Sequence, residues 1–467
     1  MHRLILLLLL ITSCNISQPD SMNVLLIYTD DQRYNTIGGL GNPEVKTPNI
    51  DALVERGTAF THAHTMGGLH GALCAPSRSM LMSGRPLFRL DGTGDHIPSD
   101  HVMIPELLAE AGYITFATGK WHNDRASFVR AFQAGDRIFF GGMHMPAVGG
   151  HEAPELFEFD PSGAYPNDNR HQVDGYSSTL FADATIDFLS EARLADQPFL
   201  AYVSFTSPHD PRTPPEPYAS WYHPDSVSLP PNYLSEHPFD NGDLDVRDER
   251  LRELPRTEEM VRQELALYYG MISEVDAQIG RILDALETNG QLDNTLVIVA
   301  GDNGLAVGSH GLLGKQNLYE HSMRVPLILA GPRIPSNEQR NQLVYVFDIF
   351  PTIAEILNLS LPETVEGESL VQWIDDSQSS GRASVFYAYR DLQRGIRTAD
   401  GWKHLQYQVN GVHTQQLFDL NSDPYETQNL ITDPSYQETL DHLRQLLVEE
   451  SMYWSDPLDL SAEKWID

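Results

Sequence analysis

Charged and polar side chains follow directly after four apolar stretches of the sequence. These stretches, residues 23–28, 114–118, 199–205 and 296–300, have the composition of strands buried on both faces of a parallel sheet. The carboxyl ends of such strands meet at one edge of the sheet, where ligands bind. The side chains that would gather at this edge are Asp30, Asp31, Lys120, His122, His209, Asp302 and Asn303. Each alone would be read as a helix cap or a structural residue, so the prediction of a site depends on their matching positions.

Four of these residues offer oxygen ligands. The carboxylates of Asp30, Asp31 and Asp302 and the amide of Asn303 are hard donors, which suit Ca²⁺ or Mg²⁺. The sequence has no Cys and His cluster at the spacing of structural zinc sites. We therefore predict a site for a hard divalent cation.

The charge balance makes the neighbouring cations informative. Acidic residues outnumber basic ones by 65 to 31, which gives a net charge of -34 and favours solubility over nucleic-acid binding. An anionic substrate would be repelled at long range, so its site needs a local group of cations. Arg78, Lys120 and Lys315 supply fixed positive charge for this purpose. His122 and His209 are candidates for proton transfer.

Cys74 is the only cysteine after the N-terminal leader. Pro76 suits the first turn of a helix and Gly84 its end, so Cys74 is expected at a helix N-terminus. The backbone N–H groups there favour an anion. Cys74 would then be a thiolate of lowered pKa or would face a bound oxyanion. A buried core cysteine is the alternative.

The remaining elements predict an α/β fold with a large, mostly parallel sheet sandwiched by helices. Thr47 suits a helix N-cap and Gly57 a helix end. The stretch 211–255 is rich in Pro, Asp and Asn and indicates a long surface excursion. Apolar periodicity predicts helices over 47–57, 104–111, 179–194 and 260–286, and a further strand over 325–330.

The sequence changes character after about residue 366. Short strand-like runs between 385 and 420 alternate with turn residues, and a helix is predicted over 436–452. We expect a main domain over residues 23–365 and a smaller α+β subdomain over 366–467, which contains an antiparallel sheet.

Residues 1–22 read as an export leader and tether. A basic start, Met1-His2-Arg3, precedes the apolar run from Leu4 to Ile11, which is too short to span a bilayer as a mature helix. Ile11-Thr12-Ser13-Cys14 resembles the lipobox of bacterial lipoproteins, in which the cysteine is lipidated. We expect an exported protein of the periplasm or cell surface, anchored to a membrane through Cys14. A plain secretory signal is the alternative.

The segment Cys74-Ala75-Pro76-Ser77-Arg78, followed by Ser83-Gly84-Arg85, resembles the signature of the formylglycine-dependent sulfatases, which belong to the alkaline phosphatase-like superfamily. In that family a maturation enzyme oxidises the cysteine to formylglycine. The resemblance covers nearly the whole mature chain. It extends to Asp30-Asp31, Thr47-Pro48-Asn49-Ile50-Asp51, Gly119-Lys120-Trp121-His122, Pro208-His209, Gly301-Asp302-Asn303-Gly304, Gly314-Lys315, Tyr319-Glu320 and Leu417-Phe418-Asp419-Leu420.

This resemblance implies hydrolysis of sulfate esters by hydrated formylglycine, with one Ca²⁺ (Mg²⁺ being less favoured) as Lewis acid. His209 would protonate the leaving oxygen, and Lys315 would hold the sulfate. Arg78 and Lys120 would anchor the formylglycine, and His122 would act as the base that restores the aldehyde. The implied metal ligands are Asp30, Asp31, Asp302, Asn303 and the modified Cys74. Asn303 departs from the His or Gln of many relatives but still offers a carbonyl oxygen.

A lipobox-bearing exported sulfatase resembles bacterial enzymes that degrade sulfated polysaccharides, so a sulfated glycan is the expected substrate. The stretch 62–73 is unusually rich in Gly and His, which affects the substrate side of the interpretation. A phosphonate or phosphodiester hydrolase of the same superfamily is one alternative, and a non-catalytic glycan-binding lipoprotein is another. The loops expected to set specificity carry Arg33, His70, His144, His151 and Arg390.

Overall fold

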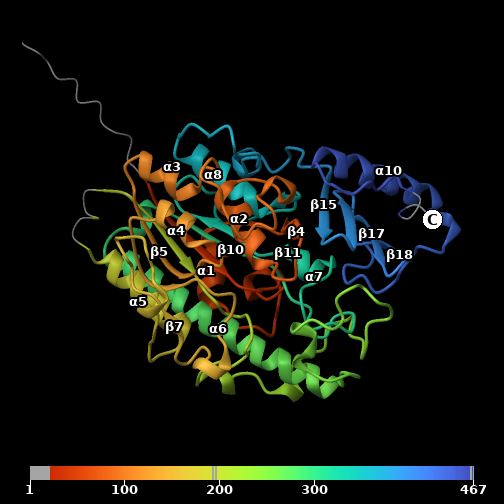
Figure 1. The fold of residues 1–467 in the computed structure, drawn as a ribbon, viewed down its shortest axis with the longest axis horizontal. Helices are drawn as coiled ribbons and strands as arrows, with labels where there is room; N and C mark the ends of the chain where they lie inside the picture. Colours follow the sequence, from red (N-terminus) through yellow and green to blue (C-terminus); the bar gives the residue numbers. More distant parts are fainter. Residues whose placement is uncertain (1–21, 192–193, 195–196, 463–464, 466–467) are drawn as a thin grey trace, which may run out of the picture.

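The computed structural model describes residues 22–191, 194, 197–462 and 465 of the chain (Figure 1). The predicted leader, with the lipidation of Cys14, lies outside these residues. Within the described part of the chain, no helix has the length and apolar character that a membrane span requires.

A sheet of eight strands, in the order β13-β2-β12-β10-β1-β9-β5-β6, forms the centre of the molecule. Its strands β10, β1, β9, β5 and β6 run parallel to one another, and β12 runs antiparallel to both of its neighbours. The predicted α/β fold with a mostly parallel sheet is therefore confirmed. The strands are β1 (Asn23–Thr29), β2 (Gly57–Phe60), β5 (Ile114–Lys120), β6 (Ala134–Phe139), β9 (Phe199–Ser204), β10 (Thr295–Gly301), β12 (Leu327–Ala330) and β13 (Glu338–Arg340).

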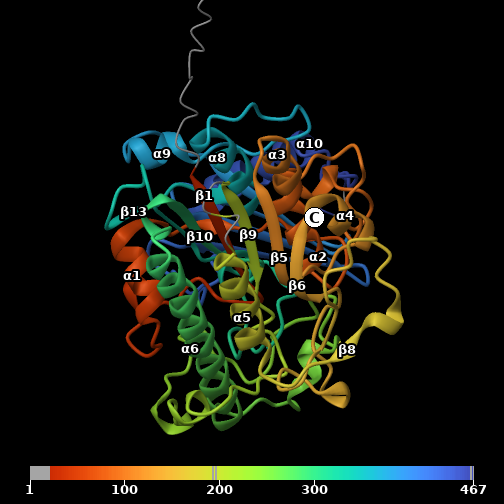
Figure 2. The same cartoon turned by 90° about the vertical axis from the view of Figure 1, so that its left-hand side faces the viewer.

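The apolar strands bury side chains on both faces of this sheet. In β1, Leu25 and Ile27 pack in one core, whereas Leu26 and Tyr28 pack in the other. Each such aliphatic side chain stabilises the fold by about 1.5–3 kcal/mol. The first core is covered by α1 (Pro48–Arg56), α5 (Ser177–Leu189) and α6 (Glu258–Thr288), and the second by α2 (Cys74–Ser83), α3 (Ile104–Glu110), α4 (Arg125–Ala131) and α8 (Ile349–Ile356) (Figure 2).

Some local predictions differ from the structure. The strand expected over 325–330 is divided at Pro326, which has no N–H for the ladder. Its first part, β11 (Arg324–Val325), joins a small sheet with β3 (Ala63–His64) and β14 (Val344–Tyr345). The helix expected over 179–194 is α5, which ends at Leu189. Thr47 stands at the N-cap of α1 without capping it, because its hydroxyl accepts from the Gly38 N–H at 2.8 Å and donates to Asp51.

The excursion over 211–255 contains only short turns of 3₁₀ helix, at Tyr218–Ser220, Pro224–Ser226 and Asp248–Leu251. Other short elements are β7 (Glu155–Leu156), β8 (His171–Gln172), α7 (Glu320–Met323) and α9 (Val371–Asp375).

The C-terminal part forms the expected antiparallel sheet. Its strands are β15 (Ser384–Tyr389), β16 (Gln393–Thr398), β17 (Trp402–Val409) and β18 (Val412–Asp419), and α10 (Gln437–Tyr453) packs against them. A fifth strand, β4 (Gly67–Gly68), pairs in parallel with β15. A Cβ atom on Gly67 would lie 2.0 Å from the Ala388 carbonyl oxygen, so this pairing requires glycine. Because β4 lies just before Cys74, the C-terminal sheet borders the predicted site. The domain boundary at residue 365 stays a prediction.

Candidate active site

The ends of four neighbouring strands bring the predicted polar residues together. Thr29, at the end of β1, is in register with Gly301, at the end of β10. The Asp302 N–H donates to the Thr29 carbonyl at 3.0 Å, and the Asp30 N–H donates to the Ser207 carbonyl at 3.3 Å. The same edge therefore carries Asp30 and Asp302, which are 272 positions apart in the sequence, as expected for an open parallel sheet.

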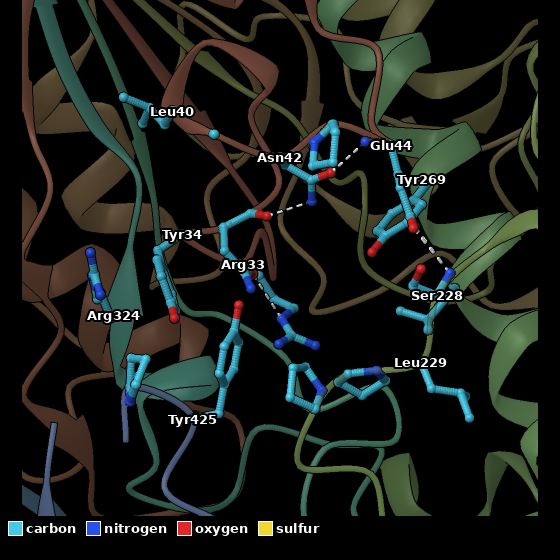
Figure 3. Close-up of a pocket in the computed structure, with 17 residues that line it drawn as sticks. Arg33, Tyr34, Leu40, Asn42, Glu44, Ser228, Leu229, Tyr269, Arg324 and Tyr425 are labelled. Carbon is cyan, nitrogen blue, oxygen red and sulfur yellow. Dashed lines mark hydrogen bonds between the residues drawn. The ribbon is translucent and has the colours of Figure 1, made fainter. Parts of the chain in front are cut away.

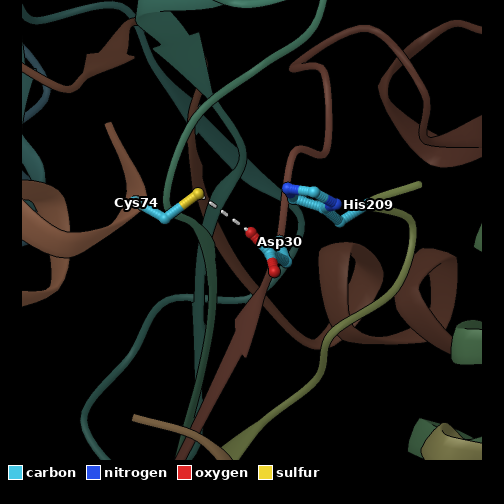
Figure 4. A group of neighbouring side chains, drawn as sticks. All are labelled: Asp30, Cys74 and His209. Carbon is cyan, nitrogen blue, oxygen red and sulfur yellow. Dashed lines mark hydrogen bonds between the residues drawn. The ribbon is translucent and has the colours of Figure 1, made fainter. Parts of the chain in front are cut away.

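Three carboxylates and the Cys74 thiol converge on one point at this edge. The ligand atoms of Asp30, Asp31, Cys74 and Asp302 all lie within 4.8 Å of one another. Figure 4 shows Asp30 between Cys74 and His209, with the Cys74 thiol donating to Asp30 Oδ1 at 3.2 Å. All four clustered side chains are buried, and Asp31 has a positive φ of 66°, a rare conformation that costs energy and is common at functional sites.

Each carboxylate has a cation beside it. Lys120 Nζ lies 2.6 Å from Asp30 Oδ2, and Arg78 Nη2 lies 3.0 Å from Asp302 Oδ2. Lys315 Nζ lies 2.5 Å from Asp31 Oδ1 and 2.7 Å from Cys74 Sγ. The local group of cations that an anionic substrate needs is therefore present in a chain of net charge -34.

The electrostatics of Cys74 differ from one of the predictions. Burial, together with the carboxylates of Asp30 and Asp302, raises the pKa of the Cys74 thiol well above its usual value. The prediction of a thiolate of lowered pKa at the N-terminus of α2 is therefore wrong, because this helix end faces carboxylates inside the protein. Burial and the charge of Asp30 also raise the pKa of Asp302 to about 6.

The donor set suits a hard divalent cation. Asn303 is fully buried, and neither its amide oxygen nor its amide nitrogen has a hydrogen-bond partner among the described residues. Buried amides are normally hydrogen bonded, so an amide in this state on the residue after Asp302 indicates a missing partner. The amide oxygen and the carboxylates are ligands that calcium and magnesium accept. No zinc-type cluster of His and Cys alone occurs among the described residues.

The side chain of Arg78 links the ends of neighbouring strands inside the protein. Its side chain is completely buried and donates to the Lys120 carbonyl at 2.9 Å, to Tyr202 at 3.3 Å and to the Ser204 hydroxyl. With its ion pair to Asp302, it links β5, β9 and β10 below the carboxylates.

The two predicted histidines, His209 and His122, have different surroundings. His209 Nδ1 donates to the Asp210 carbonyl at 2.8 Å, and its Nε2 lies 3.6 Å from Asp31 Oδ2. His122 adopts a positive φ of 65°, and its ring borders Gly142, where a Cβ atom would lie 2.7 Å from Nε2. Burial, followed by the charges of Lys120 and Arg78, lowers the pKa of His122 well below its usual value.

Two of the expected specificity residues lie inside the protein. His144 and His151 are 3% and 1% exposed, so neither is a surface residue of a loop. His151 donates from Nε2 to the His209 carbonyl at 3.2 Å and accepts at Nδ1 from Ser177 at 2.8 Å. His144 is hydrogen bonded to Thr206, 3.1 Å away. Both histidines therefore stabilise the segment that carries His209. The local sequence around them does not indicate this role.

Other residues near the site were not predicted. Asp210 pairs with Arg247, a half-exposed residue of the excursion that also contacts Asp248 at 2.5 Å. Gln316 donates to Asp248 at 2.8 Å and to the Gly71 carbonyl at 3.0 Å. Asp210 directly follows His209 in the sequence, and Gln316 directly follows Lys315. This adjacency is the signal that could have identified them as site residues. Of the remaining specificity candidates, Arg390 and His70 are partly exposed, beside Asp243 and Asp95 respectively, and Arg33 is buried in a different pocket.

Comparison with known proteins assigns the chain to a family. The family model described as Sulfatase matches residues 22–359, and that of the N-sulphoglucosamine sulphohydrolase C-terminal region matches residues 308–452. The chain belongs to the sulfatase family. As a family member it is a sulfuric ester hydrolase, and the predicted membership of the sulfatase family is confirmed.

Several curated relatives match most of this sulfatase. A sulfatase of Formosa agariphila is 26% identical over 94% of this chain and 88% of its own length. An ulvan-active sulfatase of the same organism is 27% identical over 90% of this chain and 79% of its own. An N-acetylglucosamine-6-O-sulfatase of Bacteroides thetaiotaomicron is 24% identical over 93% and 87%, respectively.

Solved structures support the fold. A protein in complex with its substrate D-glucosamine-2-N,6-O-disulfate superposes with a TM-score of 0.75 at 22% identity, and covers 93% of this chain and 98% of its own. The phosphonate monoester hydrolase of Agrobacterium radiobacter gives a TM-score of 0.73 at 23% identity, with 92% and 96% covered. Because sulfatases and phosphonate hydrolases share this fold, the fold alone does not choose between their substrates.

Proposed function

We propose that this sulfatase hydrolyses sulfate esters of a sulfated polysaccharide or oligosaccharide, with formylglycine made from Cys74 and with one bound Ca²⁺. This proposal rests on one observation: Cys74 lies beside three carboxylates and Lys315 at the N-terminus of α2. The choice of a sulfated carbohydrate is supported by relatives named for ulvan and for N-acetylglucosamine 6-sulfate.

Asp30, Asp31, Asp302 and Asn303 would hold the metal ion, with the modified residue 74 as a further ligand. A bound calcium ion supplies positive charge that polarises a sulfate oxygen and holds the ester in place. Calcium is favoured over magnesium because three carboxylates and an amide form a protein-built ligand set, whereas magnesium usually retains several waters. The unpartnered amide of Asn303 is the feature that this assignment explains.

Formylglycine supplies a hydrated aldehyde, an oxygen nucleophile that a thiol lacks. Lys315, 2.7 Å from Cys74 Sγ, lies where its ammonium group would bind a sulfate oxygen. Lys120 and Arg78 would keep the residue at position 74 and its carboxylate neighbours in place. His209 would give the proton on Nε2 to the leaving oxygen, because its Nδ1 proton is engaged by the Asp210 carbonyl. His122, whose neutral form is favoured by burial, would accept the proton when the aldehyde is restored.

Export, a lipid anchor at Cys14 and a maturation enzyme belong to the same proposal. Cys74 is 1% exposed, and α2 is buried along its whole length. A maturation enzyme would therefore have to reach the segment from Cys74 to Arg78 before the chain folds.

The decisive experiment replaces Cys74. The chain is produced with a sulfatase-maturation enzyme, and the mass of the peptide containing residue 74 reports the modification. We expect Cys74→Ser to lose turnover of 4-nitrophenyl sulfate to background, while its melting temperature stays near that of the wild type. Turnover in Cys74→Ser equal to that of the modified wild type would contradict the proposal.

A parallel assay with a phenyl phosphonate ester tests the substrate class. We expect a higher kcat/KM for the sulfate ester. A higher kcat/KM for the phosphonate would assign the chain to phosphonate hydrolysis and would leave the requirement for formylglycine intact.

A further inference from the structure

A second pocket, apart from the Cys74 site, has a volume of about 470 Å³ (Figure 3). Three segments far apart in the sequence form it: residues 33–44 after β1, residues 228–231 in the excursion and residues 424–425 in the C-terminal part. Leu265 and Tyr269 of α6, together with Arg324, complete the lining. We refer to it as the Arg33 pocket.

Arg33 gives this pocket an uncompensated positive charge. The residue is 5% exposed, and its guanidinium donates from Nη1 to the Ala306 carbonyl at 3.0 Å and from Nε to Asn35 at 3.2 Å. Among the described residues, Nη2 has no hydrogen-bond partner and no carboxylate forms an ion pair with Arg33. The buried Arg394, by contrast, is paired with Asp456. A buried guanidinium stays charged, so it normally requires an anionic partner.

Other donors point into the same space. In Figure 3 the guanidinium of Arg33 lies beside the ring of Tyr425, in the middle of the lining residues. Within the described part of the chain, no hydrogen-bond partner is recorded for the hydroxyl groups of Tyr34 and Tyr425. Arg324 lies 3.9 Å from the centre of the Tyr34 ring and adds a second guanidinium to the lining, paired with Glu320 at 3.9 Å. The one acidic lining residue, Glu44, is engaged by the backbone N–H of Ser228 at 3.1 Å.

The walls of the pocket complement these donors. Pro230, Pro231 and Leu229 present apolar surface on one side, and the aromatic ring of Tyr425 lies on another. Apolar walls around a few fixed polar groups are typical of small-ligand sites. The C–H faces of a sugar ring fit such walls, and an anionic substituent fits Arg33.

We propose that the Arg33 pocket binds a sulfated sugar residue of the polysaccharide, away from the residue that is being hydrolysed. The choice of sugar rests on the proposed function, whereas the anion site rests on Arg33. The pocket and the catalytic edge share one hydroxyl: Tyr268 donates to the Asp31 carbonyl at 2.5 Å and accepts from the Arg33 N–H at 2.9 Å. A polyanion held at two places would bind more tightly than at either alone, which offsets the repulsion from a chain of charge -34.

Binding is measured on the Cys74→Ser protein, which cannot turn over its substrate. The probes are sulfated hexasaccharides from iota-carrageenan and from heparin, their desulfated counterparts and sodium sulfate. Calorimetry gives the affinity, and hydrogen exchange gives the protected segments. We expect at least one sulfated hexasaccharide to protect the amides of residues 33–45 and 424–430.

Variants locate the interaction. Arg33→Met should weaken binding about tenfold to a hundredfold, because it removes a charged hydrogen-bond donor. Tyr425→Phe, which removes only a hydroxyl, should weaken binding about two- to fivefold and serves where Arg33→Met fails to fold. Tyr453→Phe alters a tyrosine that is 65% exposed on α10 and should bind like the parent. Lys315→Met should lose protection near residue 74 and keep it at the Arg33 pocket.

Three results with the hexasaccharides would overturn the proposal. These are the absence of protection at the Arg33 pocket with both sulfated probes, equal binding of the desulfated probes, and unchanged affinity in both pocket variants. Equal protection by sodium sulfate at the same concentration would show an anion site that does not recognise the sugar, and would also overturn it. None of these results depends on turnover, so failure here is distinguishable from failure of the proposed hydrolysis.

Discussion

Two buried clusters of charge in this molecule differ in how their carboxylates are paired with cations. The first is the Cys74 site, where the oxygens of Asp30, Asp31 and Asp302 converge on one point. The second, which we call the Glu320 cluster, joins Glu320 of α7, Lys403 of β17 and Glu426 of the loop after β18. In this cluster Lys403 Nζ lies 3.0 Å from Glu320 and 2.8 Å from Glu426.

The two clusters differ in the hydrogen-bond and ion-pair partners of their polar side chains. One lysine serves both carboxylates of the Glu320 cluster, and Glu426 also accepts from the Glu320 N–H at 2.9 Å. Although burial raises the pKa of Glu320, Arg397 and Lys403 outweigh it and hold that pKa well below its usual range. Burial and the charge of Glu320 outweigh Lys403 at Glu426 and raise its pKa to about 7. At the Cys74 site Asn303 has no hydrogen-bond partner among the described residues, and the pKa of Asp302 is raised by burial and by Asp30 to about 6. The Glu320 cluster therefore cross-links two parts of the fold, whereas the Cys74 site is arranged for a ligand.

The largest expected effect comes from breaking the Cys74 site at His209. His209→Gln should lower kcat for a sugar sulfate by about 10²–10⁴-fold, because the leaving alkoxide then receives no proton. The loss should be smaller with 4-nitrophenyl sulfate, whose leaving group needs no proton. Steady-state kinetics with both substrates and a melting curve check this. His171→Gln, on the exposed strand β8, should match the wild type. An equal loss with both substrates would assign His209 a role other than proton donor.

Breaking the Glu320 cluster should instead cost stability. Lys403→Met leaves two buried carboxylates without their shared lysine, which costs about 3–5 kcal/mol. Urea unfolding measures this cost, and kcat per folded molecule should stay within about twofold of the wild type because no catalytic group changes. Lys46→Met, at an exposed lysine over Trp221, should cost less than about 1 kcal/mol. A loss of kcat at unchanged stability would place the Glu320 cluster in the active site.

The response to calcium should distinguish the Cys74 site from the Glu320 cluster. Calcium at about a hundredfold excess over its Kd should stabilise the folded protein by about 2.7 kcal/mol, because it binds the native site and not the unfolded chain. Thermal denaturation in CaCl₂ and in EGTA measures the shift. Asn303→Ala should reduce it, whereas Asn169→Ala at an exposed position and Lys403→Met should keep it. An identical shift in Asn303→Ala would remove Asn303 from the ligand set.

The strand-end rule predicted much of the Cys74 site, since Asp30, Lys120 and Asp302 follow strands whose apolar composition is unambiguous. It could not place Lys315, which stands on an irregular segment: the sequence offered it as a candidate cation, and its role at the site came from the resemblance of its motif to a family. The pairing of β4 with β15 joins residues about 320 positions apart, and two glycines carry no periodicity that would indicate a strand. The burial of His144 and His151 also depends on how distant segments pack, which local sequence does not encode.

A third kind of buried carboxylate has neither a lysine nor a ligand site, and it is expected to give the smallest effect. Glu274 of α6 accepts from Gln278 at 2.9 Å, and its Oε2 has no partner among the described residues. Burial raises its pKa to about 7. Between the unfolded pKa near 4.5 and this value, the unfolded chain releases a proton that the folded chain keeps. Stability contributed by Glu274 is therefore lost as the pH rises through this window.

Glu274→Gln removes the titrating group and keeps the hydrogen-bonding shape. It should be more stable than the wild type above pH 7, by no more than about 3 kcal/mol, and the difference should vanish below about pH 4. Urea unfolding as a function of pH measures this, with Glu287→Gln at an exposed position of α6 as the matched control. A constant difference across the pH range would mean that packing, rather than ionisation, separates the two proteins. The pH-dependent result would complete the contrast between Glu274, whose pKa burial raises, and Glu320, whose pKa Arg397 and Lys403 hold low.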